Sequence, residues 1–460
     1  MRKYIGDKKF YYHALRLTVP MMIQYAISNF VGLLDNLMIG RLGTNAMSGV
    51  SIANQLLFVY NLMIFGAIAG VGIFTAQYHG MKNEEGVRNT FRFKLVMNLV
   101  LTVIATVLFI MLGNTLIGTF LLGEGAASDA LETLNIGKAY MRYMLPGLFP
   151  LSIAMAYSGT LRETGETTLP MKASMAAVFV NLIGNFILIY GYFGLPALGA
   201  RGAAIATDIS RVVELGILAA YTQKHCSVHT FIKGAYKHIF IPGDLAWKFF
   251  VKSLPLMCNE VLWAAGTAFM NQCYSYRSLS AVAALNIQST LWNLLGVAFI
   301  AMGEGVGIII GQVLGSGDLK KAKSDSVKLI AFTVFLGFIF GALQICLSPF
   351  FPRLYNTSSE VREMATSLLI IMGALMPVIA YAHASYFIIR AGGRIGITIL
   401  FDSCFTWLAY VPAAFILSRY TDIGIIMLVA IVQSLEFPKA IVGGIMVHSG
   451  IWARNIVKQE

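Results

Sequence analysis

Charged residues are scarce in this sequence. They make up 12% of its 460 residues, while 57% are apolar, and soluble domains carry about a quarter charged residues. This composition excludes an ordinary soluble globular protein. Because a membrane helix needs roughly 20 apolar residues, the chain can hold about a dozen membrane spans with short connections. That leaves no room for a separate soluble domain.

The sequence also lacks the motifs of metal centres, disulfide frameworks and hydrolytic enzymes. Its five cysteines are odd in number and have no CxxC or Cys/His spacing, so we expect free, structurally inert thiols. No Walker A phosphate-binding segment is present, which argues against ATP hydrolysis by this chain. The HExxH and GxSxG patterns are absent and the seven histidines are scattered, which disfavours an intramembrane enzyme.

Twelve apolar runs are separated by charged residues, glycine or proline. The first follows a basic N-terminus and is longer than the roughly 7 to 15 apolar residues of a signal peptide, and no small-residue cleavage site closes it. We therefore interpret it as a transmembrane helix. The twelve predicted spans are 14–40, 47–77, 93–121, 136–161, 168–192, 201–222, 246–276, 281–312, 326–350, 364–389, 396–418 and 423–447.

Basic residues are distributed unevenly between alternate connections. If the N-terminus is cytoplasmic, the inside segments hold 25 Lys and Arg residues and the outside segments hold eight. By the positive-inside rule, this asymmetry predicts that both termini are cytoplasmic. The formal net charge of +12 is then a topology signal, and no nucleic-acid partner is needed to explain it.

A six-helix unit occurs twice. When the chain is aligned with itself so that Pro20 falls on Pro255, residues 70–80 (GVGIFTAQYHG) match residues 305–315 (GVGIIIGQVLG) without a gap. Slightly smaller offsets relate four further pairs: Pro150 with Pro377, Gly165 with Gly392, Gly202 with Gly424, and Glu214 with Glu436. Units with an even number of spans enter the membrane in the same sense, which implies a pseudo-two-fold axis along the membrane normal.

The predicted fold class is therefore an all-α polytopic membrane protein with twelve transmembrane helices in two six-helix lobes. We expect an N-terminal lobe over residues 1–222, a cytoplasmic linker over 223–245 and a C-terminal lobe over 246–460. A central cleft is expected where the two bundles face each other.

Three segments of the first unit resemble a known family. Pro20 is followed by the run from Val31 to Gly43, which ends in Gly-Arg-Leu-Gly, then by residues 70–80, and then by Leu161-Arg-Glu-Thr-Gly165. This combination resembles the multidrug and toxic compound extrusion (MATE) family of cation-coupled drug antiporters, and the resemblance covers the full length. More distant relatives with the same fold export lipid-linked precursors, so the fold alone does not decide the cargo.

Polar residues at one depth of the first unit suggest a cation site. Asp35 has no obvious cationic partner, because Arg41 lies off its helical face. Asn181 and Asn185 are four residues apart, so their amides face the same way, and Thr207 lies at a similar depth. Carboxylate, amide and hydroxyl oxygens suit a small hard cation such as Na+. The alternative is that the Asn and Thr side chains only bind neighbouring helices.

The resemblance implies a specific cation site. In MATE proteins it is formed by a carboxylate on helix 1, two polar residues four apart on helix 5, and an Ala and a Thr four apart on helix 6. The residues of this sequence that match are Asp35, Asn181, Asn185, Ala203 and Thr207. Many relatives carry Asp where Asn185 stands, which bears on ion choice and affinity. If coupling is by sodium, the predicted Na+ ligands are Asp35, Asn181, Asn185 and Thr207.

The other acids in apolar runs are interpreted by their available partners. Arg211 can neutralise Asp208 or Glu214 along one helical face, which indicates a structural role. For Glu304, Asp402 and Glu436 we expect wet or paired positions. Glu260 is mid-span and without an obvious partner, so together with Asp35 it is a candidate for binding substrate or carrying a proton. His383 is interpreted as a packing residue.

The predicted function is secondary active antiport. An inward Na+ or H+ gradient would drive export of amphipathic, often cationic drugs or toxic compounds by alternating access between the two lobes. The alternative on the same fold is a flippase or exporter of lipid-linked or other metabolites, whose anionic cargo would favour several cationic cleft residues, whereas only Arg211 is embedded. We expect no cofactor, no enzyme activity, a monomer, and a plasma (inner) membrane location with small molecules and the bilayer as partners.

Overall fold

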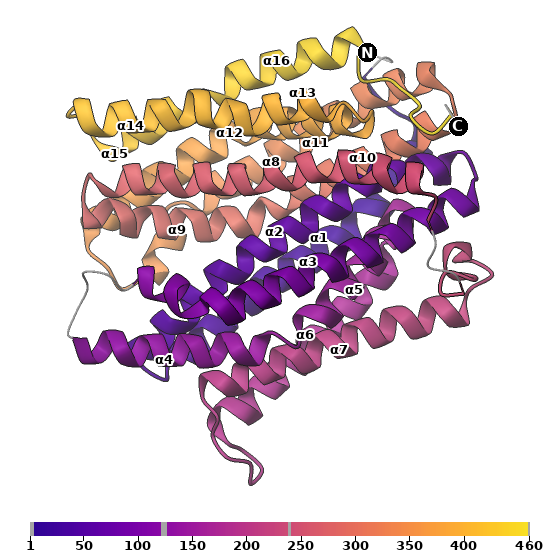
Figure 1. Cartoon of the computed structure of the whole chain (residues 1–460). Coiled ribbons are helices and arrows are strands. Elements are labelled where there is room, and N and C mark those ends of the chain that lie inside the picture. The colour runs from indigo at the N-terminus through magenta and orange to yellow at the C-terminus, as the bar shows by residue number, and fades with distance from the viewer. Residues whose placement is uncertain (1–3, 121–126, 238–240, 459–460) are drawn as a thin grey trace. The chain divides into compact units, whose positions relative to one another are not determined.

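The computed structural model describes residues 4–120, 127–237 and 241–458, and the regular secondary structure of this part of the chain is all helical, with no β-strand (Figure 1). The helices are α1 Lys8–Gly40, α2 Thr44–Gly80, α3 Glu84–Thr119, α4 Ala127–Met144, α5 Leu148–Glu163, α6 Thr168–Tyr190, α7 Ala200–Lys224, η1 Thr230–Ile232, α8 Gly243–Ser275, α9 Leu279–Leu295, α10 Val297–Gly315, α11 Leu319–Leu347, η2 Phe351–Leu354, α12 Ser359–Ala391, α13 Ile395–Ile399, η3 Leu400–Cys404, η4 Thr406–Tyr410, α14 Val411–Tyr420, α15 Ile425–Ser434 and α16 Glu436–Ser449.

The length and apolar composition of these helices make the chain a multi-pass membrane protein. Among the described residues, ten helical stretches are long and apolar enough to cross a membrane. The helices α7 and α8 are not among them, because their apolar runs are interrupted by polar residues. Those residues include Asp208, Arg211 and Glu214 on α7 and Asn259 and Glu260 on α8.

Several segments expected to be continuous helices contain breaks. The predicted span 136–161 is divided into α4 and α5, 281–312 into α9 and α10, and 423–447 into α15 and α16. Glycine or proline explains two of the breaks, since Pro146 lies between α4 and α5 and Gly296 lies between α9 and α10. Both residues weaken a continuous helix.

The predicted span 396–418 contains two π-helical turns, η3 and η4. They directly precede α14, which has Pro412 in its first turn. Proline has no N–H to donate and its ring crowds the carbonyl one turn earlier, so a wider turn accommodates it within a helix. The wider turns also change which face of the segment Asp402 and Tyr410 occupy.

The chain forms two compact units. One contains the chain up to Met22, Ala76–Asn83 and Cys258 onward, and the other contains Ile23–Thr75 and Glu84–Met257. The boundary between the units falls after Met22 in α1 and after Met257 in α8. These two positions are equivalent in the internal repeat, since the alignment that places Pro20 on Pro255 also places Met22 on Met257. The lobe boundaries expected from the sequence stay a prediction.

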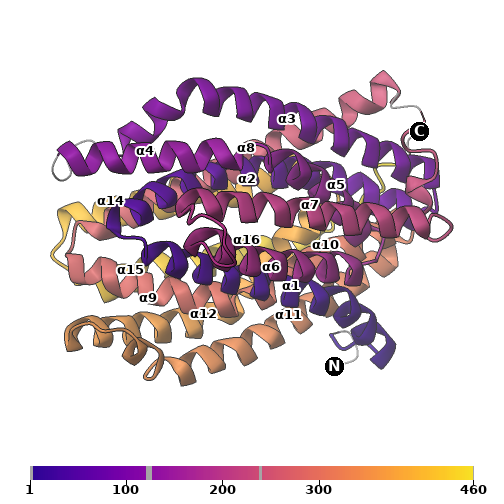
Figure 2. The ribbon, with the colours of Figure 1, turned by 90° about the horizontal axis from the view of Figure 1, so that it is seen from below.

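In the unit that contains most of the N-terminal half, α6 packs along α7 (Figure 2). Small residues allow the close approach: a Cβ on Gly202 would overlap the backbone oxygen of Leu188, and a Cβ on Gly184 would lie 2.9 Å from the Cβ of Ala206. Close packing of this kind is common between membrane helices. It brings the polar residues of the two helices together.

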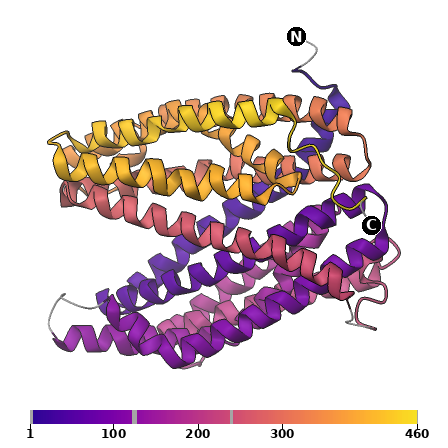
Figure 3. The ribbon, with the colours of Figure 1, turned by 45° about the horizontal axis from the view of Figure 1, so that its top comes forward.

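In the unit that contains most of the C-terminal half, α12 packs against α9, α10, α11 and α16. In Figure 3, the salmon helices α9 and α10 and the orange and yellow helices that follow them in the chain form this bundle. One of its apolar clusters includes Met302, Ile310, Leu329, Ile388 and Trp452, all nearly inaccessible to solvent.

The end of α2 meets α10 in a reciprocal contact within this same unit. A Cβ on Gly80 would overlap the backbone oxygen of Gln312, and a Cβ on Gly315 would overlap the backbone oxygen of Gln77. In the alignment that places Pro20 on Pro255, Gly80 corresponds to Gly315 and Gln77 to Gln312, so each contact is the counterpart of the other. Ala76 and Gly311, which are equivalent to each other in that alignment, lie in contact between them.

Candidate functional site

The carboxylate of Asp35, on α1, is bound by an amide from α6. Asn185 Nδ2 donates hydrogen bonds to Asp35 Oδ1 at 2.6 Å and to Asn181 Oδ1 at 3.2 Å. One amide nitrogen therefore bridges two oxygens that come from different helices. Asn181 and Asn185 face the same way because they are four residues apart on one helix.

The hydrogen bonds continue from α6 to α7. Asn181 Nδ2 donates to Thr207 Oγ1 at 3.1 Å, and Thr207 Oγ1 donates to the backbone oxygen of Ala203 at 2.9 Å. The structure thus brings all five residues of the predicted cation site into one hydrogen-bonded path. We call Asp35, Asn181, Asn185, Ala203 and Thr207 the Asp35 cluster.

The Asp35 cluster is largely buried, with Asp35 and Thr207 partly exposed, and it has no built-in cation. Asn185 is 1% exposed and Asn181 is 5% exposed. Within the described residues, no Lys or Arg lies within 4.0 Å of the Asp35 carboxylate. Asn185 Oδ1 is buried without a hydrogen-bond partner in this part of the chain. The cluster therefore offers oxygen atoms to a monovalent cation or a proton, and an unsatisfied buried acceptor is costly without such an occupant.

Ligand types suited to transition metals are not gathered here. The described part of the chain contains no group of three or more His, Cys, Asp or Glu side chains placed to hold a metal ion. The Asp35 cluster supplies one carboxylate, two amides, a hydroxyl and a backbone carbonyl. Such oxygen donors suit hard cations.

The acid Asp208 on α7 has a structural partner. Its Oδ2 accepts the backbone N–H of Gly147 at 3.1 Å, directly before the start of α5. A carboxylate is favourable there because the N-terminus of a helix carries partial positive charge. A Cβ on Gly147 would overlap Asp208 Oδ1, so only glycine fits this contact.

In the C-terminal half, the structure corrects the expectation that Glu260 lacks a partner. Arg390 Nη1 lies 3.9 Å from Glu260 Oε1, and both side chains are largely buried. The apolar pattern places Arg390 in a cytoplasmic connection, but it lies near the end of α12 and is 5% exposed. His383 packs among aromatic rings, with ring centroids 5.2 Å from Phe387 and 5.8 Å from Phe299.

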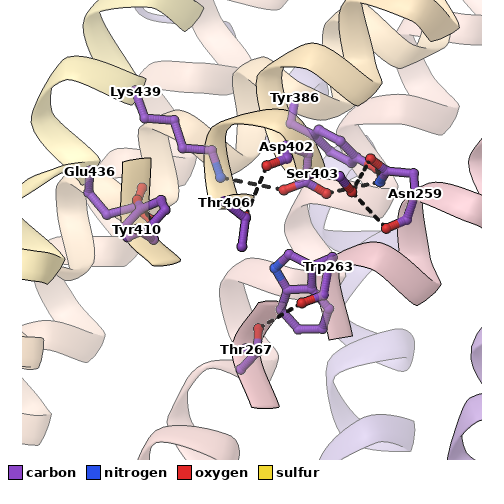
Figure 4. Close-up of polar contacts among 10 residues, drawn as sticks. All are labelled: Asn259, Trp263, Thr267, Tyr386, Asp402, Ser403, Thr406, Tyr410, Glu436 and Lys439. Carbon is purple, nitrogen blue, oxygen red and sulfur yellow. Dashed lines mark hydrogen bonds and ion pairs between the residues drawn. The ribbon is translucent and has the colours of Figure 1, made fainter. Parts of the chain in front are cut away.

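Two further ion pairs join helices. Sequence reasoning expected Asp402 to be wet or paired but did not name its partner, and it missed the pair of Lys94 and Glu163. Lys94 on α3 is 1% exposed and binds Glu163 at the end of α5. Lys439 on α16 lies 3.4 Å from Asp402 on η3 (Figure 4). Lys94 and Lys439 fall within the predicted spans 93–121 and 423–447, although the positive-inside count assigns both to the cytoplasmic side. The available signal was an acid elsewhere in the same half that needed a cationic partner.

The MatE family model matches this chain twice, over residues 20–187 and 255–416. The two matches cover most of the chain. The chain belongs to the MatE family. This confirms the family predicted from the sequence, and the two matches begin at Pro20 and Pro255, the pair that the internal repeat aligns.

Relatives of this MatE chain are named as multidrug resistance proteins. The probable multidrug resistance protein YoeA of Bacillus subtilis (strain 168) is 26% identical over 424 residues, which is 89% of this chain and 87% of that protein. The probable multidrug resistance protein NorM of Thermotoga maritima is 24% identical over 417 residues, 90% of this chain and 86% of that protein.

Solved structures show the same fold. The outward-facing structure of a multidrug resistance MATE family transporter of the MOP superfamily superposes with a TM-score of 0.85 at 18% identity, covering 98% of both chains. The MatE proteins to which this chain is similar are transporters, and the chain is accordingly a transporter and not an enzyme.

Proposed function

We propose that this MatE protein is a secondary antiporter that exports amphipathic, cationic organic compounds, driven by an inward gradient of Na+ or H+ that is coupled at the Asp35 cluster. The observation that carries the proposal is the path of hydrogen bonds from Asp35 through Asn185 and Asn181 to Thr207. A buried carboxylate held only by neutral groups needs a neutralising partner within the membrane.

The Asn185 amide gives the cluster two states. Without an ion, Nδ2 of Asn185 lies between the oxygens of Asp35 and Asn181 and supplies partial positive charge. A Na+ ion or a proton bound at Asp35 removes the need for this donor, and the amide can then turn its oxygen toward the cation. Release of the ion restores the hydrogen bonds, so occupancy of Asp35 changes the contacts between α1 and α6.

The proposed topology has twelve spans, two six-helix lobes related by a pseudo-two-fold axis, and both termini in the cytoplasm. Support comes from the two family matches that begin at the aligned residues Pro20 and Pro255 and from the reciprocal contacts of Gly80 and Gly315, since a two-fold axis produces such contacts. The excess of basic residues in alternate connections supports the orientation. We propose a monomer in the bacterial plasma membrane.

The charge pattern favours a cationic cargo over an anionic lipid-linked one. Three basic side chains that are largely buried within helices each lie beside a carboxylate: Lys94 with Glu163, Arg390 with Glu260, and Lys439 with Asp402. An anionic headgroup would need unpaired cations. Glu260 is proposed as a further carboxylate that attracts cationic substrate or carries a proton once Arg390 releases it.

Flux measurements in liposomes test this function. Reconstituted protein should export a monovalent cationic dye when an inward Na+ or H+ gradient is imposed. Asp35→Asn keeps the shape of the side chain but removes the charge, so gradient-driven export should fall to background while insertion and folding persist.

The control for this experiment is Asp129→Asn, which removes an exposed carboxylate on α4 and should leave flux unchanged. Correctly inserted Asp35→Asn protein that exports dye at the wild-type rate under both gradients would overturn the coupling role. Loss of flux in the Asp129→Asn protein would show that the assay reports surface charge.

A further inference from the structure

Asp402 of the C-terminal half is held in place by neighbouring polar groups. Asn259 Nδ2 donates to Asp402 Oδ2 at 3.0 Å. Asn259 is itself fixed, since Ser403 Oγ donates to its side-chain oxygen at 2.7 Å and to its backbone oxygen at 2.8 Å. One carboxylate oxygen is thereby anchored, and the other, Oδ1, faces Lys439 (Figure 4).

The ammonium group of Lys439 lies in surroundings suited to an organic cation. Its Nζ is 3.4 Å from Asp402 Oδ1, 5.5 Å from the ring centroid of Phe401 and 5.9 Å from that of Tyr410. A carboxylate beside aromatic rings is the usual recognition chemistry for ammonium ligands. The Tyr410 ring is fixed because its hydroxyl donates to Glu436 Oε1 at 2.5 Å.

We propose that Asp402, Phe401 and Tyr410 form a recognition site for an organic ammonium ion, that Lys439 is its tethered occupant in this structure, and that a cationic amine of the exported class binds there by displacing Lys439. The cargo class rests on the proposed function, whereas the site itself is separate from the Asp35 cluster.

Three features favour exchange at this site over a permanent ion pair. The side chains of Asp402 and Lys439 remain 17% and 12% exposed, while that of Lys94, in its pair with Glu163, is fully inaccessible. The 3.4 Å separation is longer than the usual charge-assisted hydrogen bond of about 2.7 to 2.9 Å. The lysine side chain is a flexible tether that can release its charge without moving the helix.

Glu436 gives the displaced lysine a second partner. It lies three residues before Lys439 on α16, a spacing at which side chains of a helix meet. The site therefore contains two carboxylates, Asp402 and Glu436, for one lysine. By charge count, it can hold one additional monovalent cation without leaving a carboxylate uncompensated.

Equilibrium binding of radiolabelled 2-phenylethylammonium to the purified full-length protein tests this proposal. All proteins carry Asp35→Asn, and no gradient is imposed, so the result does not depend on coupling at the Asp35 cluster. Lys439→Met removes the tethered competitor, whose effective concentration is in the millimolar range or higher. The dissociation constant of the probe for the Lys439→Met protein should therefore be lower by about tenfold or more than for the protein with Lys439.

Controls test whether the tighter binding in the Lys439→Met protein depends on Asp402 and on the charge of the probe. Adding Asp402→Asn to Lys439→Met should abolish the tighter binding, and unlabelled 2-phenylethanol, the neutral analogue, should not compete. The matched control is Lys328→Met, because Lys328 also pairs with an acid, Asp325 at 3.2 Å, and lies 5.4 Å from the ring of Phe10. That pair joins residues of a single helix, and its loss should not tighten binding.

The proposal is overturned if Lys439→Met binds the probe no more tightly than the protein with Lys439. It is equally overturned if the gain persists in the Asp402→Asn, Lys439→Met protein. Lys439→Gln, which keeps a polar side chain, serves as a second test if the methionine variant does not fold. Failure of dye export in liposomes with normal probe binding here would contradict only the coupling proposal.

Discussion

Asp35 in the N-terminal half has different surroundings from Glu260 and Asp402 in the C-terminal half. In the N-terminal half, Asp35 is held by the amide of Asn185, and no basic side chain lies within ion-pair distance in the described part of the chain. In the C-terminal half, Glu260 and Asp402 lie beside Arg390 and Lys439. Asp35 has only neutral side chains as neighbours, whereas Glu260 and Asp402 each have a basic side chain beside them.

On the proposed function, this difference separates a site for a mobile ion at Asp35 from sites with internal counter-charges. A carboxylate with a covalently tethered cation stays neutralised when a solution gradient collapses. A carboxylate with only neutral partners responds to the concentration of the ion. Two halves that are related by an internal repeat can thus differ in how their carboxylates are neutralised.

The largest expected effect comes from breaking a buried pair. Lys94→Met leaves the Glu163 carboxylate buried without the ammonium that binds it, and such a change costs about 3 to 5 kcal/mol of stability. The loss should appear in thermal unfolding of the detergent-purified protein. Asp35→Asn, which removes an acid without a paired cation, should change the free energy of unfolding by less than about 1 kcal/mol.

A double variant provides the control for this comparison. Lys94→Met with Glu163→Gln removes both charges and should recover most of the stability, because the buried charge is gone. If Asp35→Asn were as destabilising as Lys94→Met, the distinction between an internally compensated carboxylate and an ion-dependent one would not hold.

The positions of the helices were largely predictable from the sequence. Each expected span coincides with a helix or a run of helices, because a long apolar run in a membrane must satisfy its backbone hydrogen bonds internally. The π-helical turns at Leu400–Cys404 and Thr406–Tyr410 were not predicted. They depend on how the segment before Pro412 packs, which the apolar pattern does not encode.

The polar clusters were predictable only in part. The Asp35 cluster could be anticipated since Asn181 and Asn185 share a helical face and since the family motif names its members. The sequence could not predict that Asn185 presents its amide nitrogen, and not its oxygen, to Asp35. The pair of Lys94 and Glu163 joins positions far apart in the chain, so its existence depends on the packing of α3 against α5.

The next largest effect concerns the reciprocal glycine contact. Gly80→Ala and Gly315→Ala each place a Cβ on top of a backbone oxygen. Such overpacking lowers the free energy of unfolding by about 1 to 3 kcal/mol. Because the two contacts are equivalent in the internal repeat, the two losses in unfolding temperature should be of similar size. Gly113→Ala, with no atom within 4 Å of its Cβ, is the matched control. A large loss in unfolding temperature for only one of the two variants would show that the two contacts are not equivalent.

The smallest expected effect tests the charge difference itself. Asn185→Asp replaces the amide that lies 2.6 Å from Asp35 Oδ1 with a second carboxylate, and two carboxylates this close cannot both remain ionised without a shared cation or proton. For a sodium-coupled protein, Na+ binding should tighten by about tenfold, equivalent to roughly 1.4 kcal/mol. The measurement is the rise in unfolding temperature with Na+ concentration, since a ligand that binds the folded state stabilises it.

Asn181→Asp, one hydrogen bond further from Asp35, should have a smaller effect in the same direction. Weaker Na+ stabilisation of the Asn185→Asp protein, with no proton taken up in its place, would contradict a cation site between Asp35 and Asn185.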